Sequence, residues 1–267
     1  MNHDVNQFKS GFLIINKPSG PTSHDVINRL RKITGIKKIG HAGTLDPFAS
    51  GVLLVAVGRE ATKKINQFVK MDKEYEAVLR LGAETDTYDR EGKIIGIWKP
   101  ETCPSRPPVR QAGRRFENSE SFKEIITRKK IKSVLGGFTG KILQTPPMFS
   151  AKKFKGKKLY EFARRGVTIK REPVEVKIYK IKIIYFNFPM LKIMVRASSG
   201  TYIRSLAHDI GQKLGTGAYL EELKRTKTGP FGIRRAKNPG SLTSENWRHF
   251  LKKERLEKSI LFFSKIW

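Results

Sequence analysis

The spacing of hydrophobic residues predicts several buried strands in the first hundred positions. Residues 11–16 (GFLIIN) and 52–57 (VLLVAV) are short apolar runs bounded by turn-forming residues. Uninterrupted apolar runs of this length are typical of strands covered on both faces. In residues 75–82, apolar and polar side chains alternate instead, as in a half-buried strand. Residues 93–98 are predicted to return as its partner across a polar loop at 82–92.

A helical period appears in other segments. Residues 23–34 place apolar side chains at three- and four-residue spacing, with Ser23 as the predicted N-cap and Gly35 as the stop. Residues 61–71 and 121–135 are predicted to form two further helices. Strands and helices therefore mix along the first half of the chain, without the regular alternation of a parallel βαβ fold.

The second half continues this mixture. Residues 174–186 and 190–198 alternate strongly and predict a long β-hairpin. Residues 198–215 (SSGTYIRSLAHDIGQKLG) predict an amphipathic helix that begins at Ser199 or Thr201. The last 27 residues, 241–267, are predicted to be mostly helical and amphipathic.

Charge narrows the possible partners. Lys and Arg number 54 against 24 Asp and Glu in 267 residues, which gives a net charge of +30 spread along the chain. Such a charge favours a polyanionic partner, although a surface adapted for solubility would also account for it. Nucleic acid is favoured over a membrane because the basic stretches alternate with strands and no long apolar helix accompanies them.

One basic segment combines positive charge with aromatic residues. Residues 150–171 hold nine Lys or Arg and one acid, with Phe154, Tyr160 and Phe162 between them. Such a pattern suits a surface that grips phosphates while aromatic rings stack. Tyr160 and Phe162 would equally anchor a small helix to the core, and the two interpretations are compatible.

Other residue types exclude several classes of function. The single cysteine, Cys103, cannot form an internal disulfide, so the chain is expected inside the cell, in the cytoplasm. The polar amino terminus fits neither a signal peptide nor a transmembrane span. The five histidines lack the spacing of metal ligands, so no metal is expected. Residues 99–120 are rich in Pro and Arg and are expected to be an exposed loop or a partly disordered insertion.

The segment 40–58, GHAGTLDPFASGVLLVAVG, places a lone acid, Asp46, in a loop of small residues directly before a strand. Taken alone, Asp46 before Pro47 fits a solvent-exposed turn. In so basic a chain, a carboxylate near cations would instead be held ionised or used in a reaction. The neighbouring His41 and a distant GTYIR motif, which holds Tyr202 and Arg204, favour the second interpretation.

Five ordered blocks together resemble the bacterial tRNA pseudouridine synthase B family. The blocks are NKPSGPTSHDV, IGHAGTLDPFASGVLLVAVGREATK, DKEYEAVLRLGAETDTYDREG, TPPMFSAKKFKGKKLYEFARRG and SSGTYIRSLAHDIGQKLGTGAYLEELKRT. They span most of residues 11–232, in the order of the family. The resemblance implies an α+β fold with a mixed, mostly antiparallel sheet flanked by helices, and a basic mobile insertion at residues 150–171.

The resemblance also implies the reaction, which is isomerisation of the T-loop uridine of tRNA, position 55, to pseudouridine after base flipping. Asp46 matches the nucleophilic aspartate, Arg204 its arginine partner, and Tyr75 the tyrosine that stacks on the flipped base. The remaining implied site residues are Tyr202 and Leu223 in the uracil pocket, His41 against the T loop, Lys17 as a support of the active-site loop, and Lys152, Lys153, Lys155, Lys157 and Lys158 at the RNA backbone.

Further expectations concern organisation and partners. A catalytic domain is expected over residues 1–240, followed by a helical tail over 241–267 that is too short for the additional PUA domain common in bacterial members. The stretch 101–120 is longer than in typical members. The expected partner is the T arm of tRNA, bound by a monomer without a cofactor or metal. A non-catalytic tRNA-folding chaperone and a basic RNA-binding scaffold stay as alternative functions.

Overall fold

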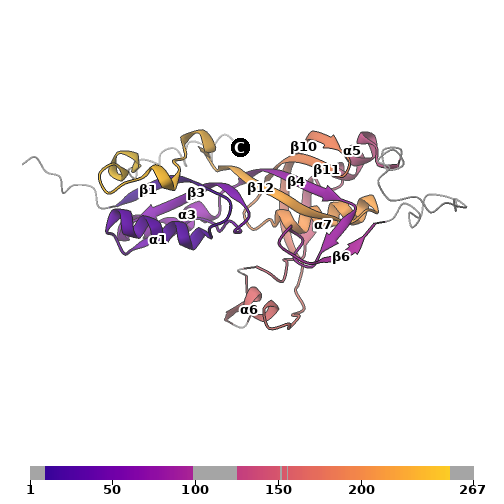
Figure 1. The fold of residues 1–267 in the computed structure, drawn as a ribbon, viewed down its shortest axis with the longest axis horizontal. Coiled ribbons are helices and arrows are strands. Elements are labelled where there is room, and N and C mark those ends of the chain that lie inside the picture. The colour runs from indigo at the N-terminus through magenta and orange to yellow at the C-terminus, as the bar shows by residue number, and fades with distance from the viewer. Residues whose placement is uncertain (1–9, 99–124, 151, 155, 253–267) are drawn as a thin grey trace, which may run out of the picture. The chain divides into compact units, whose positions relative to one another are not determined.

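The computed structural model describes residues 10–98, 125–150, 152–154 and 156–252 (Figure 1). The chain divides into two compact units, the first built from Met1–Tyr75 and Leu223–Trp267 and the second from Glu76–Glu222. The predicted insertion at 99–120, with Cys103, lies outside the described residues.

The strands of the first unit surround one central strand, β3 (Ser50–Val57). The first strand, β1 (Gly11–Lys17), lies antiparallel to β3 along its whole length. On the other side, β2 (Ile39–His41) pairs antiparallel with the end of β3, and β12 (Ala218–Thr228) pairs parallel with its start. A short strand, β13 (Phe231–Gly232), pairs with β12.

Both faces of β1 and β3 are buried, as the apolar runs predict. Alternate residues enter two clusters, one that contains Leu13 and Leu53 and one that contains Phe12 and Leu54. The first cluster packs under the helix α1 (Ser23–Thr34). The second includes Phe68 of α3, whose ring centroid lies 4.4 Å from that of Phe12.

The helices of the first unit differ from prediction at their ends. The N-cap of α1 is Thr22 and not Ser23, because the Thr22 hydroxyl accepts the Asp25 N–H in a capping box. Gly35 ends the helix in the left-handed conformation, as predicted (φ 71°). The single helix expected at 61–71 is two short ones, α2 (Arg59–Lys63) and α3 (Ile65–Val69).

The described part of the carboxyl-terminal tail, 241–252, contains a 3-10 turn, η4 (Trp247–Phe250), where an α-helix was predicted. Two further 3-10 turns, η2 (Ile233–Arg235) and η3 (Pro239–Ser241), lie before the tail and at its start. Trp247 is only 1% exposed and lies in the core cluster under α1. Lys252 extends the sheet by exchanging two backbone hydrogen bonds with Phe12, at 2.8 and 2.9 Å. The described part of the tail therefore contributes to the core of the first unit.

The second unit contains a sheet in the order β4 (Lys73–Leu81), β11 (Met190–Ala197), β10 (Val174–Asn187) and β7 (Gly140–Gln144). The predicted hairpin of β10 and β11 is confirmed, with two bulges in β10. The strand β6 (Ile94–Ile97) was predicted to pair with β4. It pairs instead with β5 (Ala83–Thr85), a short strand inside the predicted loop, as a separate hairpin.

Two helices complete the second unit. The helix α5 (Arg128–Gly136) packs against α7 (Ile203–Leu214) and β10. The residue at the N-cap of α7 is Tyr202, whose side chain makes no capping hydrogen bond, and not Ser199 or Thr201. The basic segment forms a small hairpin, β8 (Lys153–Phe154) with β9 (Lys157–Lys158), followed by α6 (Leu159–Ala163).

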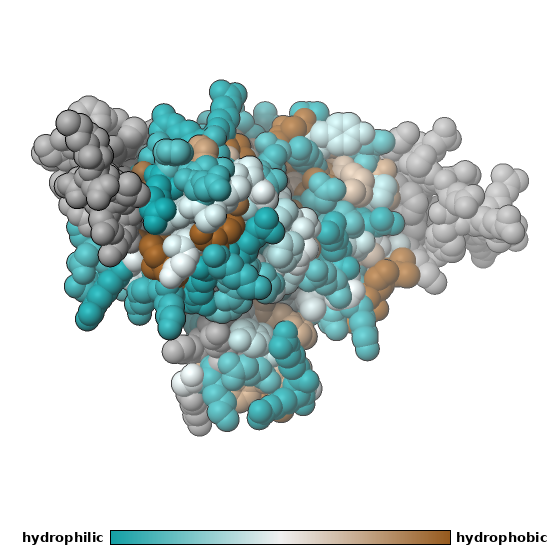
Figure 2. All heavy atoms as spheres, turned by 60° about the vertical axis from the view of Figure 1, so that its left-hand side comes forward, coloured by the Kyte–Doolittle hydropathy of each residue, from teal (hydrophilic) through white to brown (hydrophobic). Residues whose placement is uncertain are grey.

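The α+β fold with a mostly antiparallel sheet and flanking helices is thus confirmed. Hydrophilic residues cover most of the surface visible in Figure 2, and hydrophobic patches are scattered between them. In the described part of the chain, no helix has the length and hydropathy needed to span a membrane.

Candidate active site

Asp46 lies in the loop between β2 and β3, and a buried lysine holds this loop. Lys17 has no exposed surface, and its Nζ donates hydrogen bonds to the carbonyl oxygens of Pro18, Pro47 and Ala49 at 2.9, 3.0 and 2.7 Å. A buried ammonium group is stable only when its hydrogens are bonded. Lys17 therefore ties the carbonyls on the carboxyl side of Asp46 to the end of β1.

The segment before α1 holds the same loop from another direction. The Ser23 hydroxyl accepts the Leu45 N–H at 2.9 Å and donates to the Leu45 carbonyl at 3.0 Å. The Ser19 hydroxyl donates to the Phe48 carbonyl at 2.7 Å. Because Ser23 is committed to the loop, Thr22 serves as the helix cap. The residues on both sides of Asp46 are thus fixed by side chains of the NKPSGPTS motif.

A second buried cation, Arg225 on β12, reaches the loop near its start. Its Nε donates to the Val52 carbonyl at 2.7 Å, and its two terminal nitrogens donate to the carbonyls of Gly43 and Thr44 at 3.0 and 3.4 Å. This approach needs a glycine at position 51, where φ is +107° and an added Cβ would collide with the Arg225 carbonyl oxygen. The loop that carries Asp46 is therefore anchored by buried cations at both ends.

Lys73, at the start of β4, is a third buried cation of this unit. It is 6% exposed, and its Nζ donates to the carbonyls of Val69 and Met71. Burial, with a smaller effect of the nearby Arg225, lowers the pKa of Lys73 from 10.5 to about 8.

Three other predicted site residues of the first unit are largely buried. Tyr75 and Leu223 are each 8% exposed. His41, at the end of β2, is partly buried, and its Nδ1 has no hydrogen-bond partner. Burial, together with the positive charge of Arg225, lowers the pKa of His41, so its imidazole is neutral at pH 7.

Arg204 belongs to the second unit, where it sits in a dense set of contacts. It is 5% exposed and forms an ion pair with Asp89 at 3.2 Å. The same guanidinium donates to the carbonyls of Thr87 and Phe149 at 3.1 and 2.8 Å. Asp89 in turn accepts from the Thr87 hydroxyl at 2.7 Å. These contacts fix the orientation of the guanidinium at the first turn of α7.

Tyr202 is placed by its backbone. The Gln144 side chain on β7 accepts the Tyr202 N–H at 2.7 Å and donates to the Tyr202 carbonyl at 3.0 Å. Gln144 is 1% exposed, so this reciprocal pair is shielded from water. It attaches the start of α7 to the buried side of the sheet.

The basic segment presents at least part of its charge to solvent. Lys152 and Lys157 are exposed, Lys153 and Lys158 lie on β8 and β9, and Lys155 is outside the described residues. Phe154 packs edge-on against Phe162 at 6.2 Å between ring centroids, and Arg164 lies 5.3 Å from the Tyr160 ring centroid. These aromatic residues therefore contact other residues of the same segment; the two predictions, anchoring to the core and stacking on RNA, stay predictions.

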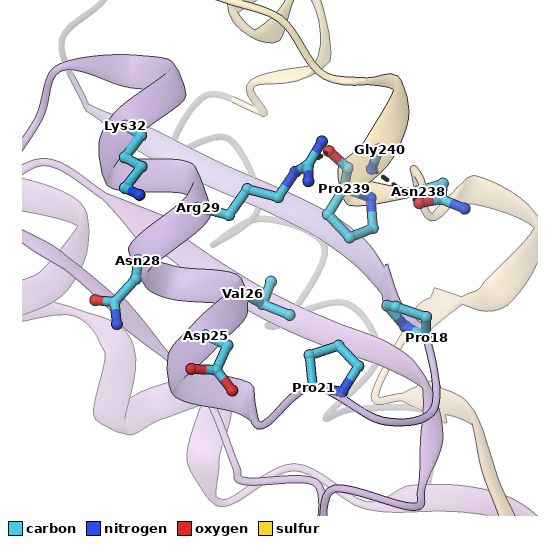
Figure 3. Close-up of a pocket in the computed structure, with 10 residues that line it drawn as sticks. All are labelled: Pro18, Pro21, Asp25, Val26, Asn28, Arg29, Lys32, Asn238, Pro239 and Gly240. Atoms are coloured by element: carbon cyan, nitrogen blue, oxygen red, sulfur yellow. Dashed lines mark hydrogen bonds between the residues drawn. The ribbon is translucent and has the colours of Figure 1, made fainter.

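A cavity of about 520 Å³ lies beside α1, and Asp46 and Tyr75 are not among the residues that line it (Figure 3). Its wall includes Arg29, whose Nε donates to the Pro239 carbonyl at 3.1 Å. The other lining residues are Pro18, Pro21, Asp25, Val26, Asn28, Lys32, Asn238 and Gly240. The wall of the cavity is thus formed by α1, the segment before it and the turn η3.

The sequence analysis did not identify Arg225, Lys73 or Asp89 as part of the site. Arg225 and Lys73 are single cations within strands of a very basic chain, and Asp89 is one of several acids in a polar loop. The sequence drew attention only to the family-like blocks that contain these residues, at LKRT, DKEY and DTYDREG. The partners of Arg225 and Asp89 lie far away in sequence, since Arg225 and Thr44 are 181 residues apart and Asp89 pairs with Arg204.

Comparison with protein families gives two matches that cover most of the chain. The TruB family pseudouridylate synthase (N terminal domain) matches residues 31–121 and 111–203. The tRNA pseudouridylate synthase B C-terminal domain matches residues 204–261.

Curated relatives carry a related name. The chain is 44% identical to a tRNA pseudouridine synthase B of Chlamydia pneumoniae over 85% of its own length and 86% of the relative. It is 46% identical to that of Protochlamydia amoebophila over 85% and 78%, and 40% identical to that of Clostridium tetani over 91% and 75%.

Solved structures show the same fold. A chain of a Cbf5-Nop10-Gar1 complex superposes with a TM-score of 0.61 at 30% identity, over 86% of this chain and 52% of that one. A chain of an H/ACA RNP bound to a substrate RNA superposes with a TM-score of 0.59 at 27% identity, over 91% and 56%. This chain thus spans about half the length of these structural neighbours.

Proposed function

This chain belongs to the TruB family of tRNA pseudouridine synthases, and we propose that it isomerises the T-loop uridine of tRNA with Asp46 as the nucleophile. The anchoring of the Asp46 loop is the observation that carries the assignment. Lys17, Ser23 and Arg225 all bond to backbone atoms on either side of Asp46. A carboxylate on a loop held in this way is positioned before the substrate arrives.

The reaction needs one carboxylate and one group that moves a proton. Asp46 engages the flipped uridine and lets the bond between N1 and C1′ break. The uracil rotates, C5 bonds to C1′ while the bond that Asp46 made to the uridine breaks and frees the carboxylate, the proton on C5 leaves, and N1 regains a proton. Atoms and electrons balance without an oxidant, reductant or water. Tyr75, largely buried on β4, is the proposed residue that stacks on the base and takes the proton from C5.

Arg204 is proposed as the cationic partner of Asp46. Its orientation is supported by Asp89 and by the carbonyls of Thr87 and Phe149. Tyr202 and Leu223 are proposed to line the uracil pocket, and His41, with a lowered pKa, to contact the T loop as a neutral ring. Lys17 is proposed to act on the loop alone, because the contacts of its Nζ with Pro18, Pro47 and Ala49 are all to backbone carbonyls.

The T arm of tRNA is the proposed partner, and the cytoplasm, where tRNA is modified, the proposed location. Lys152, Lys153, Lys155, Lys157 and Lys158 are proposed to contact its phosphates. No step of the proposed chemistry calls for a cofactor.

The substitution Asp46→Asn tests the assignment. Amide and carboxylate have nearly the same shape, but only the carboxylate is a nucleophile, so pseudouridine formation should be abolished. Binding of tRNA should stay within about tenfold, because phosphate contacts supply most of the affinity. Mass spectrometry of a T-arm transcript incubated without cofactor measures the product.

The control is Asp25→Asn, which also removes one carboxylate from the first unit but keeps a side-chain oxygen able to accept the Thr22 N–H at the start of α1. It should retain full turnover. Measurable product from Asp46→Asn after long incubation would overturn the nucleophile assignment. A wild-type protein that binds tRNA but forms no pseudouridine would favour the chaperone function instead.

A further inference from the structure

The sheet of the second unit has one covered and one exposed side. Gln144 points to the covered side and holds the start of α7, and α5 packs against β10. Because side chains alternate along a strand, the neighbours of the buried residues point the other way. We call the outward basic residues of β7, β10 and β11, with two tyrosines of β10, the basic sheet face. They are Lys141, Lys177, Lys180, Lys182, Lys192, Arg196, Tyr179 and Tyr185.

Like charges oppose each other directly on this face. Lys177 on β10 is the register partner of Lys141 on β7, and Lys180 is the register partner of Arg196 on β11. Like charges at directly opposite positions destabilise an antiparallel pair. Glu175 relieves part of this repulsion by pairing with Lys141 at 3.1 Å, and elsewhere on the face Glu76 pairs with Lys192 at 3.0 Å. Even so, positive charge prevails at the centre of the face, where it works against the pairing of the strands.

Exposed tyrosines lie among these cations. Tyr179 occupies the first bulge of β10, and its ring lies 5.3 Å from Lys177 Nζ and 5.5 Å from the Arg196 guanidinium carbon. Tyr179 is 39% exposed and Tyr185 is 53% exposed, although a tyrosine ring has a large apolar surface. Aromatic rings among Lys and Arg side chains on an open sheet are suited to stack bases while the cations contact phosphates.

We propose that the basic sheet face binds single-stranded RNA, without reading its sequence, at a site separate from the one that converts uridine. The two sites are separate because they involve opposite sides of the sheet. Tyr202 and Arg204 lie at the start of α7, which is attached to the covered side, whereas the basic sheet face is the exposed side. Opposed lysines and arginines on an exposed surface are complementary to a chain of phosphates. A protein surface would have to supply a matching acidic patch, and a membrane would leave the tyrosines without bases to stack on.

The test uses an oligocytidylate of about 15 nucleotides, which contains no uridine and so cannot be a substrate. The variant Lys177→Glu, Lys180→Glu, Lys182→Glu should bind this RNA at least about tenfold more weakly in 50 mM salt, since several phosphate contacts are lost together. Turnover of a T-arm hairpin should stay within about twofold. The melting temperature should not fall, because the new carboxylates at positions 177 and 180 would each face a cation, Lys141 or Arg196.

A matched variant separates the face from the net charge. Arg128→Glu, Lys129→Glu, Lys132→Glu makes the same charge change at exposed positions of α5, in the same unit. It should keep oligocytidylate affinity within about twofold. An equal loss in both variants, or no loss in the sheet variant, would overturn the proposal. So would binding of phosphatidylserine vesicles, and not RNA, that depends on the three lysines.

Failure of this proposal differs visibly from failure of the proposed function. Asp46→Asn abolishes turnover and leaves oligocytidylate binding unchanged, whereas the sheet variant does the reverse. Tyr179→Ser adds a milder second variant that keeps all charges. It should weaken oligocytidylate binding by roughly five- to tenfold if the ring stacks on a base. Unchanged affinity would remove the tyrosine from the site.

Discussion

At the scale of single residues, the first unit uses buried cations to satisfy backbone carbonyls. Lys17, Lys73 and Arg225 each donate to carbonyl oxygens of loops or helix ends. Carbonyls at chain reversals lack partners from regular secondary structure, and a buried one without a partner is costly. The loop geometry around Asp46 therefore depends on side chains from distant strands.

Lys73 gives a test that depends on pH. Its pKa is about 8 in the folded state, against 10.5 when unfolded. Between these values the unfolded state binds more protons, so the free energy of unfolding should rise with pH, by at most about 1.4 kcal/mol per unit. Below pH 8 this contribution is flat. Denaturant unfolding of wild type and Lys73→Met at pH 7, 8, 9 and 10 measures the difference.

The stability gap between these two proteins should therefore shift in favour of the wild type only above pH 8. Lys70→Met, at an exposed position of the same segment, is the control and should show a constant gap. A constant gap for Lys73→Met as well would show that Lys73 keeps its ordinary pKa in the folded protein.

Sequence patterns predict local residues of the site better than distant partners. The loop around Asp46 is visible as a block of small residues before a strand. The pairing of Arg204 with Asp89 is not visible in the sequence, because it joins the start of a helix to a loop more than a hundred residues away. Nothing in the local pattern distinguishes Asp89 from Asp86, which instead accepts the Lys93 N–H.

At the scale of elements, strands and helices follow the period of the sequence, and their ends follow side-chain competition. The strands β1, β3 and β10 appear where predicted. The cap of α1 moves to Thr22 because Ser23 is used by Leu45. The described part of the tail forms a 3-10 turn and not the predicted α-helix, because the apolar spacing of Trp247, Phe250 and Leu251 suits a single 3-10 turn packed on a core just as well.

Trp247 tests whether the tail supports the first unit. Its side chain is 1% exposed in the cluster under α1, so Trp247→Ala should leave a large cavity. The expected loss is about 3 to 5 kcal/mol in the free energy of unfolding, measured with denaturant. His249→Ala changes an exposed residue of the same turn and should cost less than about 0.5 kcal/mol. A loss below about 1 kcal/mol for Trp247→Ala would mean that the turn does not contribute to the core.

At the scale of the whole molecule, the excess of positive charge is the property that composition predicts best. Composition alone favours nucleic acid as the partner, but it does not tell which basic side chains contact the nucleic acid. Those on Lys17, Lys73 and Arg225 are buried and bonded within the first unit. Exposed ones such as Lys152 and Lys157 are the candidates for phosphate contacts. Burial therefore divides the basic residues into a buried group that supports the structure and an exposed group available for binding. A count of charges cannot make this distinction.

The salt dependence of tRNA binding tests the basic segment. Replacing Lys152, Lys153, Lys155, Lys157 and Lys158 by Gln should flatten the plot of log affinity against log salt by roughly 0.7 to 0.9 per lost phosphate contact. Tyr75→Ala should lower affinity by about 1 to 3 kcal/mol without changing the slope, because stacking on one base hardly depends on salt. A wild-type slope in the five-lysine variant would show that this segment does not contact phosphates.

The division of the first unit into Met1–Tyr75 and Leu223–Trp267 has a consequence for its synthesis on the ribosome. The nascent amino-terminal part already carries Asp46, but it lacks Arg225 and Trp247 until the whole of Glu76–Glu222 has been made. At ordinary elongation speeds this interval lasts roughly 7 to 30 seconds. The segment of the second unit is synthesised during that time, while the Asp46 loop still lacks the hydrogen bonds from Arg225 and the cluster under α1 still lacks Trp247. The loop that holds the proposed nucleophile therefore reaches its final anchoring only after the whole second unit has been made.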